Sequence, residues 1–307
     1  MADHVCGFCG LCRPLPANGP DLGPSRPRIL PLGHFSYTAY VTPAQILELL
    51  AVGLVTGIVG GLLGIGGSII IIPLLTLVLQ LNQHLSQAVA MIINVFVALP
   101  ALLQHHRAHA VRWDVMGKML PAGIIFILLG VESSNRVDAD TLQRFFGVFL
   151  LYMIVINVGQ LLSGKPEPLP HDQRTDWLPI TLIGAATGYM AGLLGIGGGN
   201  ISVPLLQRFA RLPLRQCIAT TAAFMCISAS VGAVRKNLAL PALTDSAGLP
   251  LGLDWHESLR IAACLAPTAV LGGLIGGRLT HILPLRWVRL AFILLLAWAA
   301  LDMLGVL

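Results

Sequence analysis

The residues of this chain whose types and spacing suit a chemical role are glycines, and they occur in two nearly identical segments. The first glycine segment, GLLGIGGS, covers residues 61–68, and the second, GLLGIGGGN, covers residues 192–200. Glycines that interrupt an apolar run end one helix, and the next helix then starts with backbone N–H groups that have no partner within it. Such a helix start attracts anions through those groups and the helix dipole. The two segments therefore predict an anion-binding site.

The candidate substrate-binding residues are these glycines, the polar residues beside them, and polar residues on the apolar run that follows. Ser68 and Asn200 are expected near the start of the next short helix. Asn94 and Thr221 lie on the runs that could flank the segments. For a single serine or threonine, a helix–helix hydrogen bond is the alternative. The full set is Gly64, Gly66, Gly67, Ser68, Asn94, Gly195, Gly197, Gly198, Gly199, Asn200, Thr220 and Thr221.

Other uses of glycine-rich segments fit less well. Neither segment completes the G-x-G-x-x-G of a dinucleotide fold, and neither contains the Gly-Lys-Ser/Thr of a phosphate-binding loop. Close helix packing stays open as an alternative, because small residues allow it. The polar residues beside both copies favour a binding role.

The elements that position these segments belong in a membrane. Of 307 residues, 55% are hydrophobic and 11% charged, and the mean hydropathy is +0.80. Eight apolar runs are each close to the roughly 20 residues that cross about 30 Å of hydrocarbon. They cover residues 45–63, 85–103, 115–131, 142–162, 178–194, 214–234, 258–276 and 287–305. Two shorter apolar pieces, 68–80 and 199–207, follow the glycine segments.

The chain is an internal duplication, because residues 56–75 and 187–206 are identical at 13 of 20 aligned positions. We expect an all-α polytopic membrane protein with two homologous halves, each containing a glycine-broken discontinuous or re-entrant helix pair, and about eight full spans plus two short helices. The expected divisions are an N-terminal extension at 1–43, disordered or with a mis-assigned start, a first transmembrane repeat at 44–164, a linker at 165–177 and a second repeat at 178–307.

The Lys and Arg distribution favours inverted halves. If each short run completed a crossing, the halves would be parallel and each face would carry eight of these residues in its loops. If each short run returns to its starting face, the halves are inverted and the counts are 11 against five. Cytoplasmic loops are enriched in Lys and Arg, so inversion places both termini outside the cytoplasm. The arginines of the extension reduce the bias to 11 against eight.

Nucleic acid and metals are poorly supported as ligands. The net charge of +5 is not gathered into a basic face, which excludes nucleic acid as a partner. Cys6, Cys9 and Cys12 begin an iron–sulfur-like spacing, but Pro16 stands where the fourth cysteine belongs. A disordered tail or a mis-assigned start is favoured over a metal site there, and we expect no cofactor.

The histidines at 84, 105, 106 and 109 are a second candidate for metal binding or proton transfer. His105 and His109 share a face only on a continuing helix, so a solvated cytoplasmic loop is favoured over a metal site for the three at 105–109. Their titration near neutral pH is one hypothesis for coupling transport to protons.

The phrases GLLGIGGSIIIIPLL and GLLGIGGGNISVPLL, the duplicated layout and the CIATT segment at 217–221 resemble the TauE/SafE sulfite exporter family, also described as the toluene sulfonate uptake permease superfamily. The resemblance covers residues 44–307. It implies a multi-pass carrier of the bacterial inner membrane for sulfur-containing anions such as sulfite, sulfonates, sulfoacetate or thiosulfate, without a bound cofactor.

Carried over residue by residue, the family pattern falls on Ala219, Thr220 and Thr221 and on seven glycines, namely Gly64, Gly66, Gly67, Gly195, Gly197, Gly198 and Gly199. The equivalent positions of the first half, Ala88 to Ala90, have no hydroxyl groups. This departure puts a symmetric pair of hydroxyl ligands in doubt.

The leading hypothesis is a secondary transporter in which two glycine-broken helices hold a small sulfur-containing anion and the halves alternate around it. The partners would be that substrate, the lipid bilayer and a coupling proton or cation; the oligomeric state is open. A membrane enzyme lacks support, because no nucleophile–base pair, carboxylate pair or metal cluster lies in the runs. A passive anion channel and a transporter of another small organic anion stay open.

Overall fold

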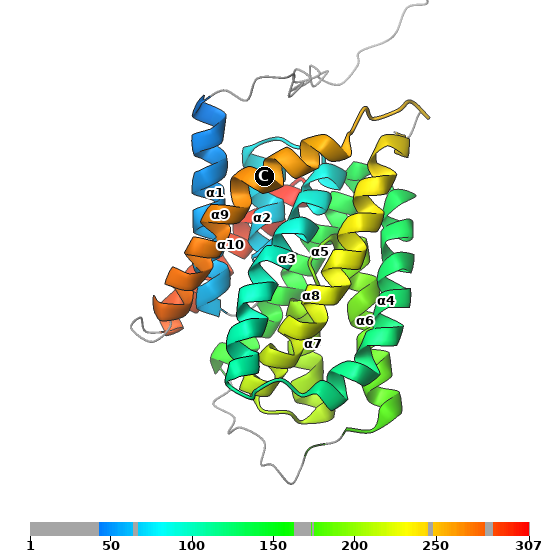
Figure 1. Cartoon of the computed structure of the whole chain (residues 1–307). Helices are drawn as coiled ribbons and strands as arrows, with labels where there is room; N and C mark the ends of the chain where they lie inside the picture. The colour runs from blue at the N-terminus through cyan, green and yellow to red at the C-terminus, as the bar shows by residue number, and fades with distance from the viewer. Residues whose placement is uncertain are drawn as a thin grey trace, which may run out of the picture. The chain divides into compact units, whose positions relative to one another are not determined.

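The computed structural model describes residues 43–63, 67–162, 173, 175–244, 248–279 and 285–306, and within them it is built from helices (Figure 1). The elements of the first half are α1 (Pro43–Leu63), α2 (Ser68–Pro73) with the π-helical turn η1 (Leu74–Val78), α3 (Gln83–Arg107), α4 (Trp113–Asn135) and α5 (Ala139–Leu162). Those of the second half are α6 (Trp177–Leu194), α7 (Gly199–Leu205) with the π-helical turn η3 (Leu206–Ala210), α8 (Leu214–Ala239) with the 3-10 turn η4 (Leu240–Ala242), α9 (Trp255–Leu279) and α10 (Leu285–Met303).

Every long apolar run of the sequence forms a helix. Among the described residues, six helices are long and apolar enough to cross a membrane, namely α3, α4, α5, α6, α8 and α9. Shorter apolar stretches lie in α1, in α10 and along α2 with η1. Large apolar side chains on the outside, such as Val155, Leu182 and Leu294, suit contact with lipid. The chain is therefore a multi-helix membrane protein, and eight full crossings stay a prediction.

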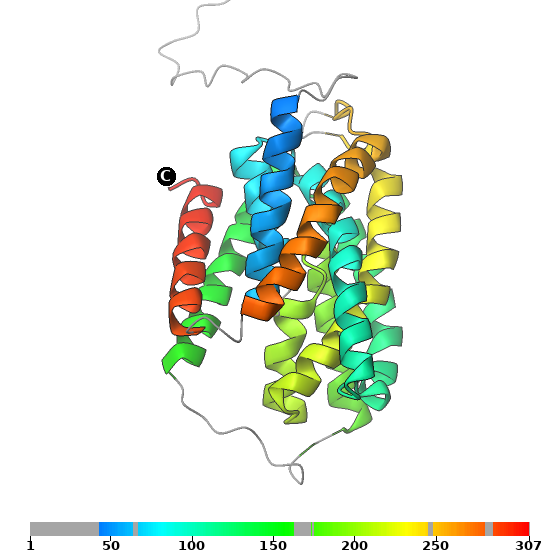
Figure 2. The same ribbon diagram turned by 60° about the vertical axis from the view of Figure 1, so that its left-hand side comes forward.

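The two halves pack against each other in an exchanged pattern. The first helix of each half lies along the fourth helix of the other, so that α1 packs on α9 and α6 packs on α4. The helices α3 and α8 cross at the centre, and α5 packs on α10. Figures 1 and 2 show the starts of α1 and α3 at one end of the helices and the starts of α6 and α8 at the other end.

Glycines make this exchanged packing close. A Cβ added at Gly188 of α6 would lie 2.3 Å from the carbonyl oxygen of Gly123 on α4. A Cβ at Gly57 of α1 would lie 2.2 Å from the carbonyl oxygen of Ala269 on α9. Gly57 and Gly188 are equivalent positions of the repeat. Both helix pairs therefore bring their backbones together through glycine, as small residues do in membrane helices.

The short helices follow the same plan in both halves. Each contains one proline, Pro73 or Pro204, and each then passes directly into a π-helical turn. Proline disfavours continuation of an α-helix, since it lacks an N–H and its ring displaces a carbonyl group. In the structure the proline is followed by a change from α- to π-helical hydrogen bonding, while the helical path continues for another turn.

Some of the sequence predictions fall outside the described residues. They concern the extension up to residue 42, most of the linker, and Gly64 and Gly66 of the first glycine segment. The last residues of the linker contact the start of α4 and the residue before it. There Arg112 Nη1 donates to Gln173 Oε1 at 2.5 Å, and Lys118 Nζ donates to the Thr175 carbonyl at 2.6 Å.

Candidate functional site

The second glycine segment bends the chain between α6 and α7. Gly195, Gly197 and Gly198 have φ angles of +78°, +69° and +84°, a region that side chains with a Cβ disfavour. A Cβ at Gly197 would also lie 2.7 Å from Asn94 Nδ2, and one at Gly198 would lie 2.7 Å from Thr187 Cγ2. The bend therefore needs glycine both for its conformation and for its surroundings.

Two side chains of α3, from the other half, hold this bend. Gln87 Nε2 donates to the carbonyl of Leu193 at 3.1 Å, and Asn94 Nδ2 donates to the carbonyl of Gly195 at 3.4 Å. The two donors are seven residues apart, which places them on one face of the helix. A helix of the first half thus donates hydrogen bonds to carbonyl groups at the end of α6.

The two glycine segments meet directly. Ser68, the first residue of α2, donates from Oγ to the carbonyl of Ile196 at 2.8 Å. Both residues are buried. Gly67 precedes Ser68 with an ordinary helical φ of −79°, and its carbonyl accepts the first hydrogen bonds of the short helix. The break of the first half therefore lies against the break of the second, inside the protein.

Polar atoms beside the second segment have no hydrogen-bond partner among the described residues. They are both side-chain atoms of Asn200, the Oδ1 of Asn94 and the Oγ1 of Thr187. Asn200 is 1% exposed, so its amide is shielded from solvent. Buried polar groups are nearly always paired, and unpaired ones beside a helix start are suited to a ligand.

Ser68 and Asn200 were expected near the caps of the short helices. They lie in the first turn of each helix, but their side chains do not cap it. The N-cap residues are Gly67 and Gly198, and neither short helix has a side-chain cap hydrogen bond. Ser68 instead spans the two segments. Its hydroxyl donates to the Ile196 carbonyl and not to its own helix, because the bend leaves that buried carbonyl without a backbone donor.

The two candidate threonines of α8 have hydrogen-bond partners on different elements. Thr221 Oγ1 accepts a hydrogen bond of 3.0 Å from Ser202 Oγ on α7, so it lies beside the short helix. Thr220 Oγ1 accepts from the backbone N–H of Arg112 at 3.1 Å, at the start of α4. The structure therefore brings Gly67, Ser68, Asn94, Thr221 and the second segment together, and assigns Thr220 to the α3–α4 connection.

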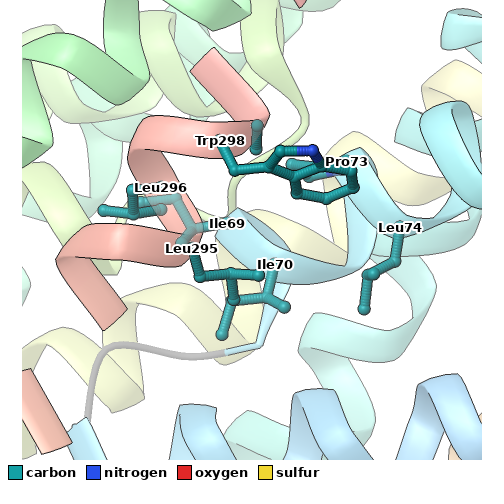
Figure 3. Close-up of a pocket in the computed structure, with 8 residues that line it drawn as sticks. Ile69, Ile70, Pro73, Leu74, Leu295, Leu296 and Trp298 are labelled. Carbon is teal, nitrogen blue, oxygen red and sulfur yellow. The ribbon is translucent and has the colours of Figure 1, made fainter. Parts of the chain in front are cut away.

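A small cavity lies on the other side of α2. Its volume is about 10 Å³, and apolar side chains of α2, η1 and α10 line it, including Ile70, Leu295 and Trp298 (Figure 3). One water needs a space of about this size together with polar partners. The cavity is therefore a packing gap and not the anion site.

Sequence reasoning missed a polar cluster between α3, α4 and α8. Lys236 was counted among the loop cations, but α8 continues to Ala239 and buries the Lys236 side chain completely. Its Nζ donates to Ser134 Oγ at 2.8 Å and Asn135 Oδ1 at 2.9 Å, and lies 3.0 Å from His84 Nδ1. A signal was available and was not used: the sequence contains neither glycine nor proline between Gly232 and Pro241, which favours a continued helix.

The histidines near the end of α3 do not form one helical face. The helix ends at Arg107, and His109 has a φ of +51° in the following turn. His106 instead packs edge-on against Trp113, with ring centroids 5.7 Å apart. The loop expected at 105–109 is therefore corrected in part, because His105 and His106 lie in the last turn of α3 and His109 lies beyond it.

Comparison with known proteins agrees with this architecture. Residues 49–303 match the family model described as sulfite exporter TauE/SafE. A probable membrane transporter protein, MamO, of Paramagnetospirillum magneticum is 26% identical over 295 residues, which is 85% of this chain and 45% of that protein. Probable membrane transporter protein YunE of Bacillus subtilis is 24% identical over 264 residues, 76% of this chain and 88% of that one.

The extent of these matches differs. The chain spans about half the length of the MamO proteins that it matches, 45% of the protein from Paramagnetospirillum magneticum and 45% of the protein from Magnetospirillum gryphiswaldense. Probable membrane transporter protein MJ0441 of Methanocaldococcus jannaschii is covered to 94%, at 23% identity. No solved structure matches the chain.

Proposed function

Because this chain belongs to the sulfite exporter TauE/SafE family, we propose that it is a secondary transporter that moves a small sulfur-containing anion across the bacterial inner membrane. Sulfite, an organosulfonate, sulfoacetate and thiosulfate are the candidate substrates. The observation that carries the proposal is the contact of Ser68 with Ile196, which joins two breaks in apolar helices at one buried place.

An anion at this place would meet donors and little charge. The N–H groups that begin α2 and α7 precede the first hydrogen bonds to the Gly67 and Gly198 carbonyls and have no partner within their own helices. Asn200 adds a buried amide group without a hydrogen-bond partner among the described residues. Dipoles of this kind bind anions in transporters at discontinuous helices. The proposed substrate site comprises Gly67, Ser68, Asn94, Thr221 and the second glycine segment. Gly64 and Gly66, which lie outside the described residues, are included from the sequence pattern alone.

We propose further that the halves, residues 44–164 and 178–307, are inverted repeats that rock around this site. The exchanged packing of α1 on α9 and of α6 on α4 supports a two-fold relation between the halves. The ends at which α1, α3, α6 and α8 start support opposite directions (Figures 1 and 2). Alternating access follows in other transporters when one repeat moves against its inverted partner.

The test is counterflow in proteoliposomes that contain the full chain. Liposomes preloaded with unlabelled sulfite, thiosulfate, sulfoacetate or taurine should take up the same labelled compound faster than empty ones for at least one of the four. A carrier shows this acceleration because the loaded site returns faster, whereas a passive channel does not. Uptake without acceleration would identify a channel, and uptake of none of the four would contradict the sulfur-anion proposal.

A further inference from the structure

We propose that Lys236 and His84 form the proton-binding site that couples substrate movement to protons. The proposal rests on the proposed transport function and assigns its coupling ion to named residues. Three observations carry it: a completely buried lysine, the neutral acceptors that surround it, and a chain of hydrogen bonds from this cluster to the second glycine segment.

The lysine is held by as many acceptors as it has protons. Lys236 is 0% exposed, and its Nζ lies 2.8 Å from Ser134 Oγ, 2.9 Å from Asn135 Oδ1 and 3.0 Å from His84 Nδ1. An ammonium group has three donors, so each donor has one acceptor. Nδ1 of His84 can accept only in a neutral ring whose proton is on Nε2. The protonated cluster thus contains one positive charge.

This charge has no acidic partner. Among the described residues, the ion pairs within 4.0 Å do not include Lys236. A buried charge without a counterion is costly, and a lysine can lose its proton where an arginine cannot. The cluster is therefore suited to exchange one proton.

The charged groups around the cluster pair outside it, except that the charge of Asp138 also acts on His84. On α4 and just beyond it, Glu132 pairs with Arg235 at 2.6 Å and with Arg136 at 3.6 Å. Before α5, the exposed Asp138 accepts a hydrogen bond from the Thr141 N–H at 2.9 Å.

The first turn of α9 contributes charges that act on one another. Glu257 interacts with Asp254 and with Arg260. The remaining titratable group that faces Lys236, from α3, is His84 itself. None of the acidic groups is within ion-pair distance of the lysine, so no carboxylate neutralises its charge.

The neutral cluster would remain hydrogen-bonded after the proton leaves. A neutral amine has a lone pair, and the Ser134 hydroxyl can rotate to donate to it. In the protonated state that hydroxyl accepts from Lys236 and donates to Gln87 Oε1 at 2.9 Å. Loss of the proton therefore redirects the hydrogen bond that the Ser134 hydroxyl donates, from Gln87 Oε1 to Lys236 Nζ.

Gln87 connects this change to the substrate site. Its Nε2 donates to the carbonyl of Leu193, two residues before Gly195, where the chain bends. The path from Lys236 through Ser134 and Gln87 to α6 thus contains three hydrogen bonds. A ligand at the bend and a proton at Lys236 act on the same chain, so each alters the affinity for the other.

Comparison of the two repeats shows that a cation able to release its proton occurs at one end of the α3–α8 pair and not at the other. The repeat offset relates His84 to Arg215 and Lys236 to His105, so each end of the α3–α8 pair carries a histidine and a cation. The charge of Arg215 acts on His105, but Arg215 is exposed. Only the Lys236 end is sealed from solvent and carries a cation that can lose its proton.

The test combines anion flux with luminal pH. Proteoliposomes of the full chain contain a pH-sensitive dye, and the probe is whichever of sulfite, thiosulfate, sulfoacetate and taurine shows counterflow. In the wild type, probe uptake should change the luminal pH beyond the change in protein-free liposomes. Lys236→Arg, which keeps the charge, and Lys236→Met, which removes it, should abolish this proton movement while counterflow continues. His84→Leu, which removes the acceptor, should reduce it by about tenfold or more, the effect of one lost hydrogen bond to a charged group.

The matched control is Lys118→Arg, because Lys118 donates to a backbone carbonyl outside the cluster. This variant should keep both counterflow and proton movement. Wild-type counterflow without proton movement overturns the proposal without any variant. Proton movement retained by Lys236→Met, or anion uptake lost in Lys236→Met but normal proton coupling in Lys236→Arg, overturns it as well. No counterflow in the wild type overturns the proposed function first, and this inference with it.

Discussion

The hydroxyl of Ser68 donates a hydrogen bond of 2.8 Å to the carbonyl of Ile196, across 128 residues of chain. This contact joins the start of a short helix in one half to the glycine bend of the other. At membrane depth such a contact is needed because the bend frees carbonyl groups that lipid cannot satisfy. The breaks of the two halves therefore stabilise each other.

Replacing Ser68 by alanine should lower the thermal stability of the purified protein. The Ile196 carbonyl would stay buried without its donor, which costs about 1–3 kcal/mol. Ser230→Ala is the control, because the Ser230 hydroxyl donates to Cys226 within its own helix. Equal unfolding temperatures for the two variants would show that the contact between the segments contributes nothing.

Gly197→Ala should abolish anion counterflow. The φ of +69° disfavours any Cβ, and the added atom would lie 2.7 Å from Asn94 Nδ2. A left-handed conformation costs an ordinary residue about 1–2 kcal/mol, and the displaced Asn94 changes the site itself. Gly117→Ala is the control, since no atom lies within 4 Å of the new Cβ. Counterflow at the wild-type rate in Gly197→Ala would exclude the bend from the substrate site.

Gly57→Ala and Gly188→Ala should destabilise the protein to a similar extent. Each new Cβ would overlap a carbonyl oxygen of the opposing helix, at 2.2 Å for Gly57 and 2.3 Å for Gly188. Overpacking of this kind costs about 1–3 kcal/mol for each substitution. Gly159→Ala, with nothing within 4 Å, should be neutral or stabilising. The measurement is thermal unfolding in detergent. A large difference between the first two variants would argue against equivalent packing of the two halves.

Asn200→Ala should separate ligand binding from stability. The Asn200 amide makes no hydrogen bond within the described residues, so its loss should leave the unfolding temperature unchanged or raise it. The affinity for the transported anion should fall by about tenfold or more, as for one hydrogen bond to a charged group. Binding is measured by calorimetry with the anion that shows counterflow. A drop in stability together with normal affinity would make Asn200 a packing residue.

The orientation of the helices can be tested with single cysteines. In a background whose six native cysteines are replaced by serine, Ala108→Cys reports on the α3–α4 connection and Asp138→Cys on the turn before α5. Both native positions are exposed, and α4 separates them. An impermeant maleimide should label position 138 in right-side-out vesicles and position 108 only in inside-out ones. The reverse labelling would contradict the orientation predicted from the Lys and Arg counts.

Burial of Lys236 changes those counts without reversing them. Five cations were assigned to the face opposite the cytoplasm, and the removal of Lys236 from the loops leaves four. The bias toward inverted halves therefore grows. Hydropathy placed the end of this run at residue 234 because Arg235 and Lys236 are charged. In the structure the helix continues, and the acceptors of Lys236 come from α3 and α4, which a linear pattern does not reveal.

The positions of the helices could be predicted because they depend on local properties. Apolar length, glycine and proline act within a few residues, so the eight long runs and the two short pieces all appear as helices. The glycine bends were predicted for the same reason, and positive φ angles at Gly195, Gly197 and Gly198 show the backbone conformation that only glycine adopts easily.

The sequence by itself determined the membrane class, the duplication and the places where apolar helices break. Only the tertiary structure decided that Ser68 reaches Ile196, that Gln87 and Asn94 hold the bend of the other half, and that Lys236 lies among neutral acceptors. The physical reason is that hydropathy and glycine act along the chain, whereas hydrogen-bond partners depend on which backbones approach closely. Here glycine contacts such as that of Gly188 with Gly123 permit the approach.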